Sequence, residues 1–305
     1  MEAPQVDLVH SDRYLGYVLG PGHPTRPVRS ANMLALVRNA GTPHRLVEPT
    51  VAPEEDLLLV HDATYIDQVR SGWHDEWEGH RPQLHELAAL IVGGTVDAAR
   101  RIAAGSATRA FHAMGAKHHA MADTASGFCI YNDMAIAATV LANSGMKVLY
   151  LDWDAHHGDG VEALLAHRTD VMTASIHNGH IFPGTGHTHA PERAAYNWPL
   201  PSGASGADLL AALDEALSMG STFGPDVVLL AAGADGHEMD PLGQLGYRLP
   251  DFAEAARRVS DFSWSHCQGR LLGGGAGGYL ADDWTPRVWA SVFEQLAGSA
   301  EVEAR

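Results

Sequence analysis

Residues 148–160 read VLYLDWDAHHGDG, an apolar run that leads without a break into three acids and two histidines. The first four residues are typical of a strand buried on both faces. Polar side chains at the end of such a strand carry a desolvation cost, which a divalent metal ion offsets best. Asp154 and His156 are two residues apart, so in an extended segment both project to one side, as does Asp152. The stretch therefore predicts a metal site with Asp152 behind a ligand or beside a further ion; the alternative is a solvated loop in which Asp159 caps a helix.

Three other apolar runs, 171–176, 227–230 and 270–272, also predict buried strands, with helical patterns between them. Helices are expected at 27–41, 84–104, 132–145, 205–220 and from residue 250 onward. Strands and helices that alternate in this way form a mostly parallel sheet with right-handed crossovers and helices on both faces. Because no repeat or linker divides the chain, we expect a single α/β domain over residues 1–305, with functional groups at the carboxyl ends of the strands.

The composition narrows the classes of function. Of the 305 residues, 46% are hydrophobic and 19% are charged, which suffices for a buried core. The formal charge of −17 argues against a nucleic-acid partner and is interpreted as a solvated surface, or alternatively as an acidic rim that steers cationic substrates. Two cysteines make no disulfide framework, no apolar stretch is long enough to span a membrane, and residues 1–4 do not begin a signal peptide. We therefore expect a cytoplasmic protein with no membrane partner.

A second carboxylate follows the apolar run 227–232, which ends in the sequence GADGH with Asp235 at its centre. Taken alone, Asp235 is better explained by a turn or a helix cap. Beside Asp154 and His156 it becomes the third ligand of a metal. Two carboxylates and one imidazole leave an open coordination position, which is typical of catalytic rather than structural sites. Zn²⁺ is the expected ion, although Fe²⁺ or Co²⁺ would accept the same ligands.

A pair of adjacent histidines, His118 and His119, precedes the stretch 125–133, ASGFCIYND. Such a pair is a weak signal by itself and is equally compatible with a polar loop. Asp152 and Asp159 are available to orient the two imidazoles, however, and an acid beside a histidine fixes its tautomer and raises its basicity. The pair is therefore interpreted as acid–base machinery. Cys129, next to an aromatic residue, is interpreted as a packing residue and not as a nucleophile.

The run 271–279, LLGGGAGGY, is a strand followed by glycines that let the backbone approach a site closely. Tyr279 then lies on a loop, where its hydroxyl can stabilise an oxyanion at the open position of a metal. A phosphate-binding glycine loop is the alternative, but the run lacks both the Lys-Ser/Thr ending and the GxGxxG spacing of such loops.

In combination, these motifs resemble the histone deacetylase superfamily, which has the arginase/deacetylase-like fold. The resemblance is close to the bacterial acetoin-utilisation and acetylpolyamine amidohydrolase branches and runs from about Tyr14 to Trp289. The matching motifs are residues 22–24 with 26–27, 118–119, 126–133, 152–160, 182–186, 233–235 and 277–279. The resemblance implies a zinc-dependent amidohydrolase that removes acetyl or other short acyl groups from lysine side chains or acylated amines. The substrate would then be an acetylated protein, an acetylated peptide or a small acetylated amine.

The resemblance also implies a role for each matching residue. The metal ligands would be Asp154, His156 and Asp235. The catalytic residues would be His119 paired with Asp159 as general base and acid, His118 paired with Asp152 as its electrostatic partner, and Tyr279 as the group that polarises the acyl carbonyl. The substrate-binding residues would be Phe128 and Phe182 along the tunnel, Leu242 at its rim, and Gly127 through its carbonyl. A K⁺ ion would lie near Asp152, Asp154, His156, Ser175 and Ile176.

Three features depart from the family pattern. Ala276 lengthens the glycine run before Tyr279. The segment 71–84, which contains Trp73 and Trp77, does not match the substrate-gripping acidic loop of the eukaryotic enzymes closely. An acid in this segment could still hold a peptide backbone or a polyamine, and its tryptophans mark either a substrate mouth or a contact in a homo-oligomer. Leu242 stands where polyamine-selective relatives carry an acid, which favours a neutral acyl-lysine stem.

Two remote alternatives differ in chemistry. An arginase-type ureohydrolase shares the Asp-Ala-His element at Asp154, but it needs a second metal. Gly158 and His237 occupy the positions where that enzyme class supplies the carboxylates of the second ion. The other alternative is a non-catalytic acyl-lysine binder on a degenerate enzyme scaffold, for which the sequence gives little reason because every catalytic role has a candidate residue.

Overall fold

The computed structural model describes residues 6–298, so the N-terminal residues considered above for a signal peptide lie outside the described part. Eight strands form one sheet in the order β2-β1-β3-β8-β7-β4-β5-β6, and every neighbouring pair is parallel. The strands are β1 Val6–Val9, β2 His44–Val47, β3 Arg109–His112, β4 Val148–Asp152, β5 Val171–Asn178, β6 Ala195–Leu200, β7 Val227–Ala231 and β8 Leu271–Gly274. The predicted parallel α/β sheet is thereby confirmed.

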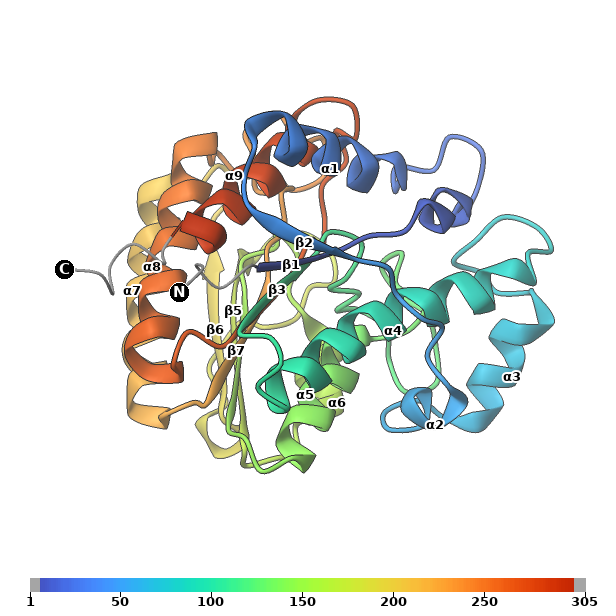
Figure 1. Ribbon diagram of the computed structural model, residues 1–305, viewed down its shortest axis with the longest axis horizontal. Coiled ribbons are helices and arrows are strands. Elements are labelled where there is room, and N and C mark those ends of the chain that lie inside the picture. The colour runs from blue at the N-terminus through green and yellow to red at the C-terminus, as the bar shows by residue number, and fades with distance from the viewer. Residues whose placement is uncertain (1–5, 299–305) are drawn as a thin grey trace.

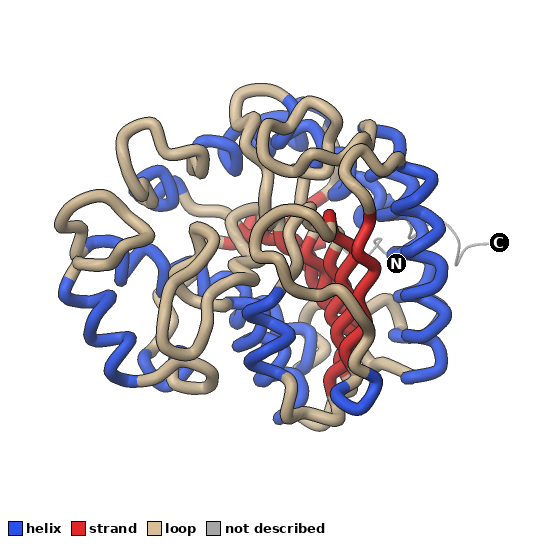
Figure 2. Tube along the Cα trace, turned by 180° about the vertical axis from the view of Figure 1, so that it is seen from behind, coloured by secondary structure: helices blue, strands red, loops and turns tan. Residues whose placement is uncertain are grey.

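Helices cover both faces of the sheet, as Figures 1 and 2 show. The helices are α1 Val28–Ala40, α2 Glu54–Leu57, α3 Ala63–Ser71, α4 Gln83–Ala103, α5 Asp133–Asn143, α6 Asp159–Leu165, α7 Gly206–Phe223, α8 Leu249–Cys267 and α9 Trp284–Gly298, with short 3-10 turns at Asp12–Gly16 and Pro191–Arg193. One face packs against α1, α7, α8 and α9, and the other packs against α4, α5 and α6. None of the described helices is both long and apolar enough to cross a membrane.

The alternation of side chains along β4 explains why both faces are buried. Leu149 and Leu151 join the hydrophobic core under α7 and α8, whereas Val148 and Tyr150 join the core under α5 and α6. Successive residues of a strand point to opposite faces, so a strand between two helical layers must be apolar at every position. This packing accounts for the continuous apolar run in the sequence.

The end of α7 differs from the prediction. The helix was expected to end near Gly220, but it continues to Phe223 and ends at Gly224, whose φ of 69° is left-handed. Gly220 instead lies at the packed face of the helix, where a Cβ atom would approach Leu149 Cδ2 to 2.9 Å. The glycine therefore permits close packing of the helix on β4 and does not stop the helix.

The last strand is also shifted from its expected position. β8 was predicted at 270–272, but it begins at Leu271 and continues through Gly273 and Gly274. A Cβ atom at Gly273 would lie 2.7 Å from Phe111 Cδ2, so the first glycines of the run serve the packing of the strand. Arg270 precedes the strand and donates a hydrogen bond from Nε to the Asp226 carbonyl at 2.7 Å.

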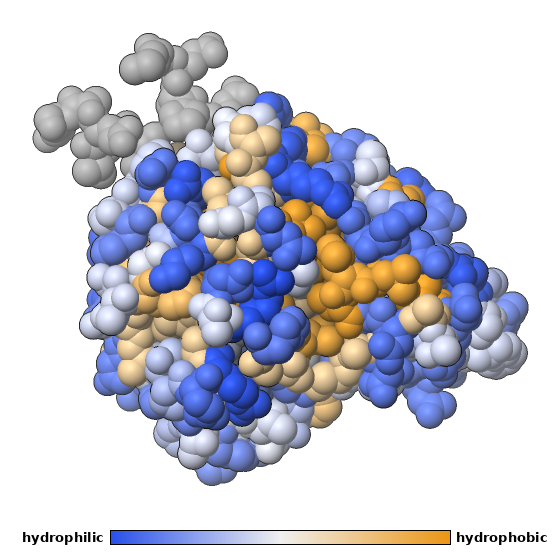
Figure 3. Space-filling model, turned by 90° about the horizontal axis from the view of Figure 1, so that it is seen from below, coloured by the Kyte–Doolittle hydropathy of each residue, from blue (hydrophilic) through white to orange (hydrophobic). Residues whose placement is uncertain are grey.

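The surface is mostly hydrophilic, but Figure 3 shows a continuous apolar area bordered by hydrophilic residues on the face seen from below. Exposed apolar areas of this kind occur at ligand and subunit contacts. Trp73, which the sequence analysis associated with a substrate mouth or a subunit contact, is 60% exposed, whereas Trp77 is buried. The homo-oligomer remains a prediction.

Candidate active site

The carboxyl ends of β4 and β7 bring the three predicted metal ligands together. These two strands are neighbours in the sheet, so the loops that follow them begin side by side. His156 Nδ1 lies 3.1 Å from Asp154 Oδ1 and 2.9 Å from Asp235 Oδ2. One ligand atom from each of the three residues lies within 4.8 Å of the other two, and all three residues are buried. His156 and Asp235 are far apart in the sequence, but the pairing of β4 with β7 brings them into contact.

Backbone amides hold the two carboxylates in place. The N–H of Ala155 donates to Asp235 Oδ1 at 2.9 Å, and the N–H of Gly277 donates to Asp154 Oδ2 at 2.6 Å. A Cβ atom at Gly277 would lie 2.1 Å from Asp235 Oδ2, so only glycine fits at this position. The glycine run therefore supplies the amide that orients Asp154 and leaves room for Asp235, whose orientation is fixed by the Ala155 amide.

The charges of the three ligands require a cation between them. Burial opposes a charged His156, but the hydrogen bonds to Asp154 and Asp235 outweigh it and raise the pKa of His156 to about 10. Burial, followed by the nearby Asp154 carboxylate, raises the pKa of Asp235 to about 7. Two carboxylates that face one imidazole nitrogen need either a proton or a metal ion to offset their repulsion. Two oxygen donors and one nitrogen donor suit Zn²⁺, Fe²⁺ or Co²⁺, so the residues present fit a catalytic metal.

The two adjacent histidines lie beside this cluster, each paired with an acid as the sequence predicted. Nδ1 of His118 is 2.7 Å from Asp152 Oδ2, and Nδ1 of His119 is 2.7 Å from Asp159 Oδ1. Asp152 also accepts a hydrogen bond from the Tyr150 hydroxyl at 2.6 Å. Each acid fixes the tautomer of its imidazole and leaves Nε2 available for chemistry.

The two imidazoles differ in basicity although they are neighbours. Burial lowers the basicity of His118, but Asp152 and Asp154 outweigh it and raise the pKa of His118 to about 9. Burial, and then the charge of His118, lower the pKa of His119 to about 4 despite the contact with Asp159. Pairs whose environments separate their pKa values in this way are typical of acid–base catalysis. These shifts favour a neutral His119 and a cationic His118 near neutral pH.

The loop that carries the histidines is held by two residues for which the sequence analysis proposed no such function. The side-chain amide of Asn132 donates to the carbonyls of His118 at 3.3 Å and of Ala120 at 3.0 Å. The carboxylate of Asp133 accepts from the N–H of Lys117 at 2.6 Å and from that of Ala116 at 3.0 Å. The sequence marks Asn132 only as a helix cap, and it also fills that position by accepting from the Ala135 N–H.

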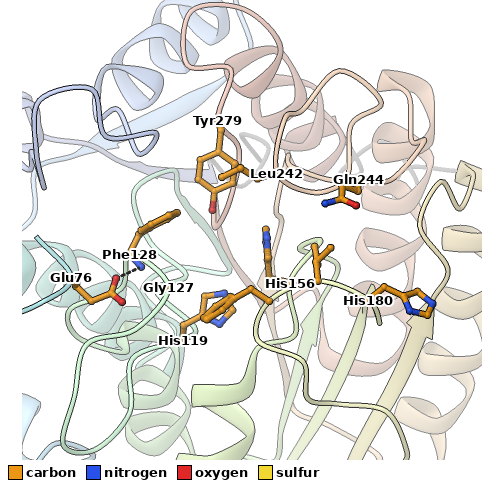
Figure 4. A pocket seen from close by; sticks show the side chains of 11 residues that line it. Glu76, His119, Gly127, Phe128, His156, His180, Leu242, Gln244 and Tyr279 are labelled. Atoms are coloured by element: carbon orange, nitrogen blue, oxygen red, sulfur yellow. Dashed lines mark hydrogen bonds between the residues drawn. The ribbon is translucent and has the colours of Figure 1, made fainter.

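A cavity of about 490 Å³ opens beside the ligands and the histidine pair. Its lining includes every predicted substrate-binding residue together with Glu76 and three residues that the sequence analysis did not identify. The lining residues are Glu76, His119, Gly127, Phe128, His156, His180, Ile181, Phe182, Leu242, Gln244 and Tyr279. Figure 4 shows most of these side chains converging on one space from separate parts of the fold. His180, Ile181 and Gln244 stand in loops without a chemical motif, so only their position identifies them.

Gly127 and Phe128 form one wall of the cavity. Gly127 has a φ of 54°, and a Cβ atom there would lie 2.3 Å from His119 Cδ2. Phe128 has a φ of 66°, and its N–H donates to Glu76 Oε2 at 2.9 Å, the contact drawn as a dashed line in Figure 4. This contact brings an acid of the segment 71–84 to the cavity, as the sequence analysis considered. Burial raises the pKa of Cys129 to about 12, in agreement with a packing role for its thiol.

Tyr279 stands opposite this wall. Its N–H donates to Asp240 Oδ2 at 2.8 Å, and its ring centroid lies 6.4 Å from that of His156. In Figure 4 the hydroxyl is directed into the cavity, toward the space between Phe128 and His156. Burial raises the pKa of Tyr279 well above its ordinary value, so the hydroxyl stays protonated and can donate. Asp240 was not identified from the sequence, because a single acid after a turn carries no specific signal.

Phe182 lines the cavity beside His119 and His156. Its ring centroid lies 5.0 Å from that of His119 and 6.3 Å from that of His156, and its side chain is 49% exposed. The residues predicted near a K⁺ ion lie behind the ligands: Ser175 on β5 is the register partner of Asp152 on β4, and Ile176 follows it.

Comparison with known proteins shows similarity to histone deacetylase domains over nearly the whole chain. Residues 23–296 match the histone deacetylase domain. The acetoin utilization protein AcuC of Bacillus subtilis (strain 168) is 34% identical over 317 residues, which cover 95% of this chain and 81% of that protein. AcuC of Staphylococcus aureus (strain COL) is 34% identical over 313 residues, which cover 94% of this chain and 80% of that protein. The crystal structure of the HDA15 HD domain superposes with a TM-score of 0.88 at 26% identity and covers 97% of this chain and 90% of that one.

Proposed function

Because the chain belongs to the histone deacetylase family, we propose that it is a metal-dependent hydrolase that removes acetyl or other short acyl groups from lysine side chains or small acylated amines. Membership of the family makes the enzyme a hydrolytic deacetylase. Its dependence on a metal and its class of substrate are what we propose. One observation carries the proposal: His119, His156 and Tyr279 line a single cavity, so a proton acceptor, a metal ligand and a hydroxyl donor face the same bound amide. We further propose that it acts in the cytoplasm.

The metal would be held by Asp154, His156 and Asp235. Zn²⁺ is the first choice for this donor set, with Fe²⁺ or Co²⁺ as alternatives. When bound, the ion acts as a Lewis acid on the acyl oxygen and lowers the pKa of a neighbouring water from about 15.7 to about 7. The K⁺ ion predicted behind these ligands, near Ser175 and Ile176, remains part of the proposal.

The side chains of this protein supply the proton transfers. His119 is neutral and faces the cavity, so its Nε2 accepts a proton from the attacking water as the carbon–oxygen bond forms. The same nitrogen then donates that proton to the leaving amine as the carbon–nitrogen bond breaks. The second proton of the water passes from the new carboxyl group to the amine, so the products are a carboxylate and an ammonium group. His118, held cationic by Asp152, offsets the negative charge that develops on the substrate. The Tyr279 hydroxyl donates a hydrogen bond to the acyl oxygen as it becomes an oxyanion.

The cavity wall determines how the substrate lies. The rings of Phe128 and Phe182 would flank the apolar stem of the acylated amine, with Leu242 at the rim. The carbonyl of Gly127 would accept the amide N–H, in place of the weak 3.3 Å contact from the Cys129 thiol. This arrangement suits a lysine side chain, whose four methylene groups lie between the amide and the polypeptide.

An acetylpolyamine is the second candidate substrate, because Glu76 places a carboxylate in the lining of the cavity. A distant ammonium group of a polyamine would find its counter-charge there.

A ureohydrolase is not proposed. His237 stacks on Trp284 with ring centroids 4.4 Å apart, and its Nδ1 accepts from the Met239 N–H at 3.2 Å. Among residues 6–298, the three ligands named above are the only cluster suited to a metal.

The proposal is tested by acetate release from matched panels of acetyl-lysine peptides and acetylpolyamines, with and without a chelator. We expect release from at least one panel, its loss on chelation, and its return when Zn²⁺, Fe²⁺ or Co²⁺ is added back. Turnover that survives complete metal removal would exclude metal-dependent hydrolysis. Binding of acetyl-lysine peptides without any acetate release would instead favour the non-catalytic binder.

A further inference from the structure

A second, smaller cavity of about 20 Å³ adjoins the reaction centre. Four residues, His119, Gly127, Phe128 and Tyr279, line both this cavity and the large one, so the two spaces meet at the acid–base group and the hydroxyl donor. The volume is enough for about one or two water molecules, or for a group of that size. If the amine leaves through the large cavity, the acyl chain beyond the carbonyl carbon points into the small one.

Besides His118, whose charge is shared with Asp152, two cationic side chains, Arg29 and Lys117, line the small cavity. Arg29 is 2% exposed and Lys117 is 4% exposed. The Arg29 guanidinium donates from Nη1 to the Gly278 carbonyl at 2.7 Å and lies 4.9 Å from the centre of the Trp289 ring. Its Nε is buried without a hydrogen-bond partner. One donor of Arg29 is therefore unsatisfied in an interior where such a group is costly.

The Lys117 ammonium lies 5.7 Å from the centre of the Tyr17 ring. Within residues 6–298, no carboxylate lies within ion-pair distance of Lys117 or of Arg29. Burial, and then the charge of Arg29, lower the pKa of Lys117 to about 8, so the ammonium remains largely charged near neutral pH. Asp133, Asp154 and Asp235 act on the two cations only at longer range, and two buried cations without a direct ion pair are unfavourable unless an anion joins them.

The acids nearest to the small cavity are already committed. Asp133 accepts from the backbone N–H groups of Ala116 and Lys117 and from the Thr95 hydroxyl at 2.5 Å. Asp154 and Asp235 face His156 and, in the proposed enzyme, the metal. The Cys129 thiol, which also lines the cavity, stays protonated at neutral pH because burial raises its pKa to about 12. The cavity therefore presents excess positive charge and hydrogen-bond donors.

The walls of the small cavity are held in an uncommon backbone conformation. Ala116, Phe128 and Ala276 are non-glycine residues with φ values of 62°, 66° and 56°, and all three line it. Such conformations persist only where the surrounding contacts enforce them, and they cluster at functional sites. The departure at Ala276 noted in the sequence thus belongs to this wall.

We propose that the small cavity is a carboxylate site, and that the enzyme hydrolyses the lysine amide of malonic acid, malonyl-lysine, whose distal carboxylate is about the size that the cavity admits. This inference rests on the proposed function, because the acyl carbonyl must sit at the metal site for its chain to reach Arg29 and Lys117. The distal carboxylate of the acyl group pairs with the Lys117 ammonium and accepts from Arg29. The reaction is the same hydrolysis: water adds to the acyl carbon, the amine leaves, and a dicarboxylate is formed.

The test compares two lysine peptides that differ only in the charge of the acyl group. Malonyl and 3-methylbutyryl have the same number of non-hydrogen atoms and the same branching, but only malonyl is anionic; acetyl and succinyl peptides complete the panel. We expect the wild-type enzyme to have a kcat/KM for malonyl at least ten-fold above that for 3-methylbutyryl. Lys117→Met should reduce this ratio ten-fold or more, and Lys117→Arg should retain it. Lys147→Met, the same change at an exposed lysine, should leave it unaltered.

The possible outcomes separate a failure of the proposed function from a failure of the carboxylate site. If no acyl peptide is hydrolysed, the proposed function fails. If acetyl-lysine is hydrolysed but the wild-type enzyme prefers the neutral 3-methylbutyryl group, only the carboxylate site is wrong. The site is equally overturned if Lys117→Met weakens inhibition by free acetate while the acyl preference stays the same, since the pocket then serves the product alone. If Lys117→Met does not fold, as judged by thermal unfolding, Lys117→Gln gives the same comparison.

Discussion

The rings of His118 and His119 lie 4.0 Å apart, centroid to centroid, yet burial and charge move their pKa values in opposite directions. The neutral imidazole of His119 can accept a proton, whereas the cationic imidazole of His118 cannot. This asymmetry supports our proposal that His119 alone carries out the proton transfers. It also makes the assignment testable with two substitutions of the same kind.

His119→Gln should lower kcat by about 10²–10⁴, the usual contribution of a positioned general base. His118→Gln should have a smaller effect, because its charge acts on the substrate without transferring a proton. Steady-state kinetics on an acetyl-lysine peptide, with metal content measured in parallel, separates the two variants. A larger loss in His118→Gln than in His119→Gln would reverse the assigned roles.

Tyr279→Phe should lower kcat by about 10²–10³, because one donor to the oxyanion is lost. The phenyl ring keeps its contacts with Phe128 and His156, so KM and the bound metal should stay close to their wild-type values. Kinetics and elemental analysis of the purified variant provide the measurement. Near-full activity in this variant would remove Tyr279 from the mechanism.

Asp235→Ala should abolish metal binding and, with it, hydrolysis. The substitution leaves His156 facing one carboxylate in place of two, and two donors hold a divalent ion far more weakly than three. Asp240→Ala is a suitable comparison, since Asp240 binds the Tyr279 backbone and not the ligand cluster; it should keep the metal and lose part of its activity. Full metal occupancy in Asp235→Ala would contradict the ligand set.

Glu76→Gln should distinguish between the two classes of substrate. The amide oxygen still accepts from the Phe128 N–H, but the charge is lost. We expect kcat/KM for an acetylpolyamine to fall roughly two- to five-fold, as for a partly exposed ion pair, with little change for an uncharged acetyl-lysine peptide. Equal effects on both substrates would mean that Glu76 acts only through the position of Phe128.

The stability of the fold should depend on pH through His112. Burial, followed by the charges of Lys117 and His10, lowers the pKa of His112 from its ordinary 6.5 to about 3. The unfolded chain therefore binds a proton that the folded chain rejects, and stability is full above pH 6.5 and falls as the pH drops toward 3. His112 bonds to the Tyr14 hydroxyl at 2.7 Å and to the Thr95 hydroxyl at 2.9 Å.

His112→Gln should reduce this dependence. Between pH 7 and pH 5, its free energy of unfolding should fall by about 2 kcal/mol less than that of the wild type, since 1.36 kcal/mol corresponds to one pKa unit. At pH 7 it should be less stable by about 1–3 kcal/mol, because buried hydrogen bonds are lost. Urea unfolding at both pH values measures the two effects. Parallel losses in the two proteins would assign the acid sensitivity to other groups.

The four strands that the sequence predicts, β4, β5, β7 and β8, are consecutive in the interior of the sheet. The edge strands β2 and β6 were not predicted, because β2 is largely exposed and β6 contains Pro199. β1 and β3 contain buried charges that hide their apolar pattern. Asp7 in β1 is compensated by Arg45 at 2.6 Å and by Arg101 at 2.9 Å, and Arg109 in β3 donates to Ser260 Oγ at 2.7 Å. Partners so distant in the sequence cannot be recognised from a local pattern.

In the candidate site, too, some residues can be predicted from the sequence and others only from the folded structure. Asp154, His156 and Asp235 each follow an apolar run, so the local sequence marks them as candidate ligands. The parallel sheet then predicts that the ends of their two strands lie at the same edge. Arg29 and Lys117 carry no such signal. Arg29 lies in α1 and Lys117 in the loop after β3, and their meaning depends on a shared cavity that only the folded chain forms.

The contact of Gly277 with Asp154 spans 123 positions of the chain, and that of His156 with Asp235 spans 79. During synthesis on the ribosome, the first two ligands emerge long before the third, and the Gly277 amide emerges later still. A nascent polypeptide that ends between Asp235 and Gly277 therefore contains all three ligands but lacks the amide that orients Asp154. We therefore expect the proposed ion to be bound tightly only after synthesis has passed Gly277.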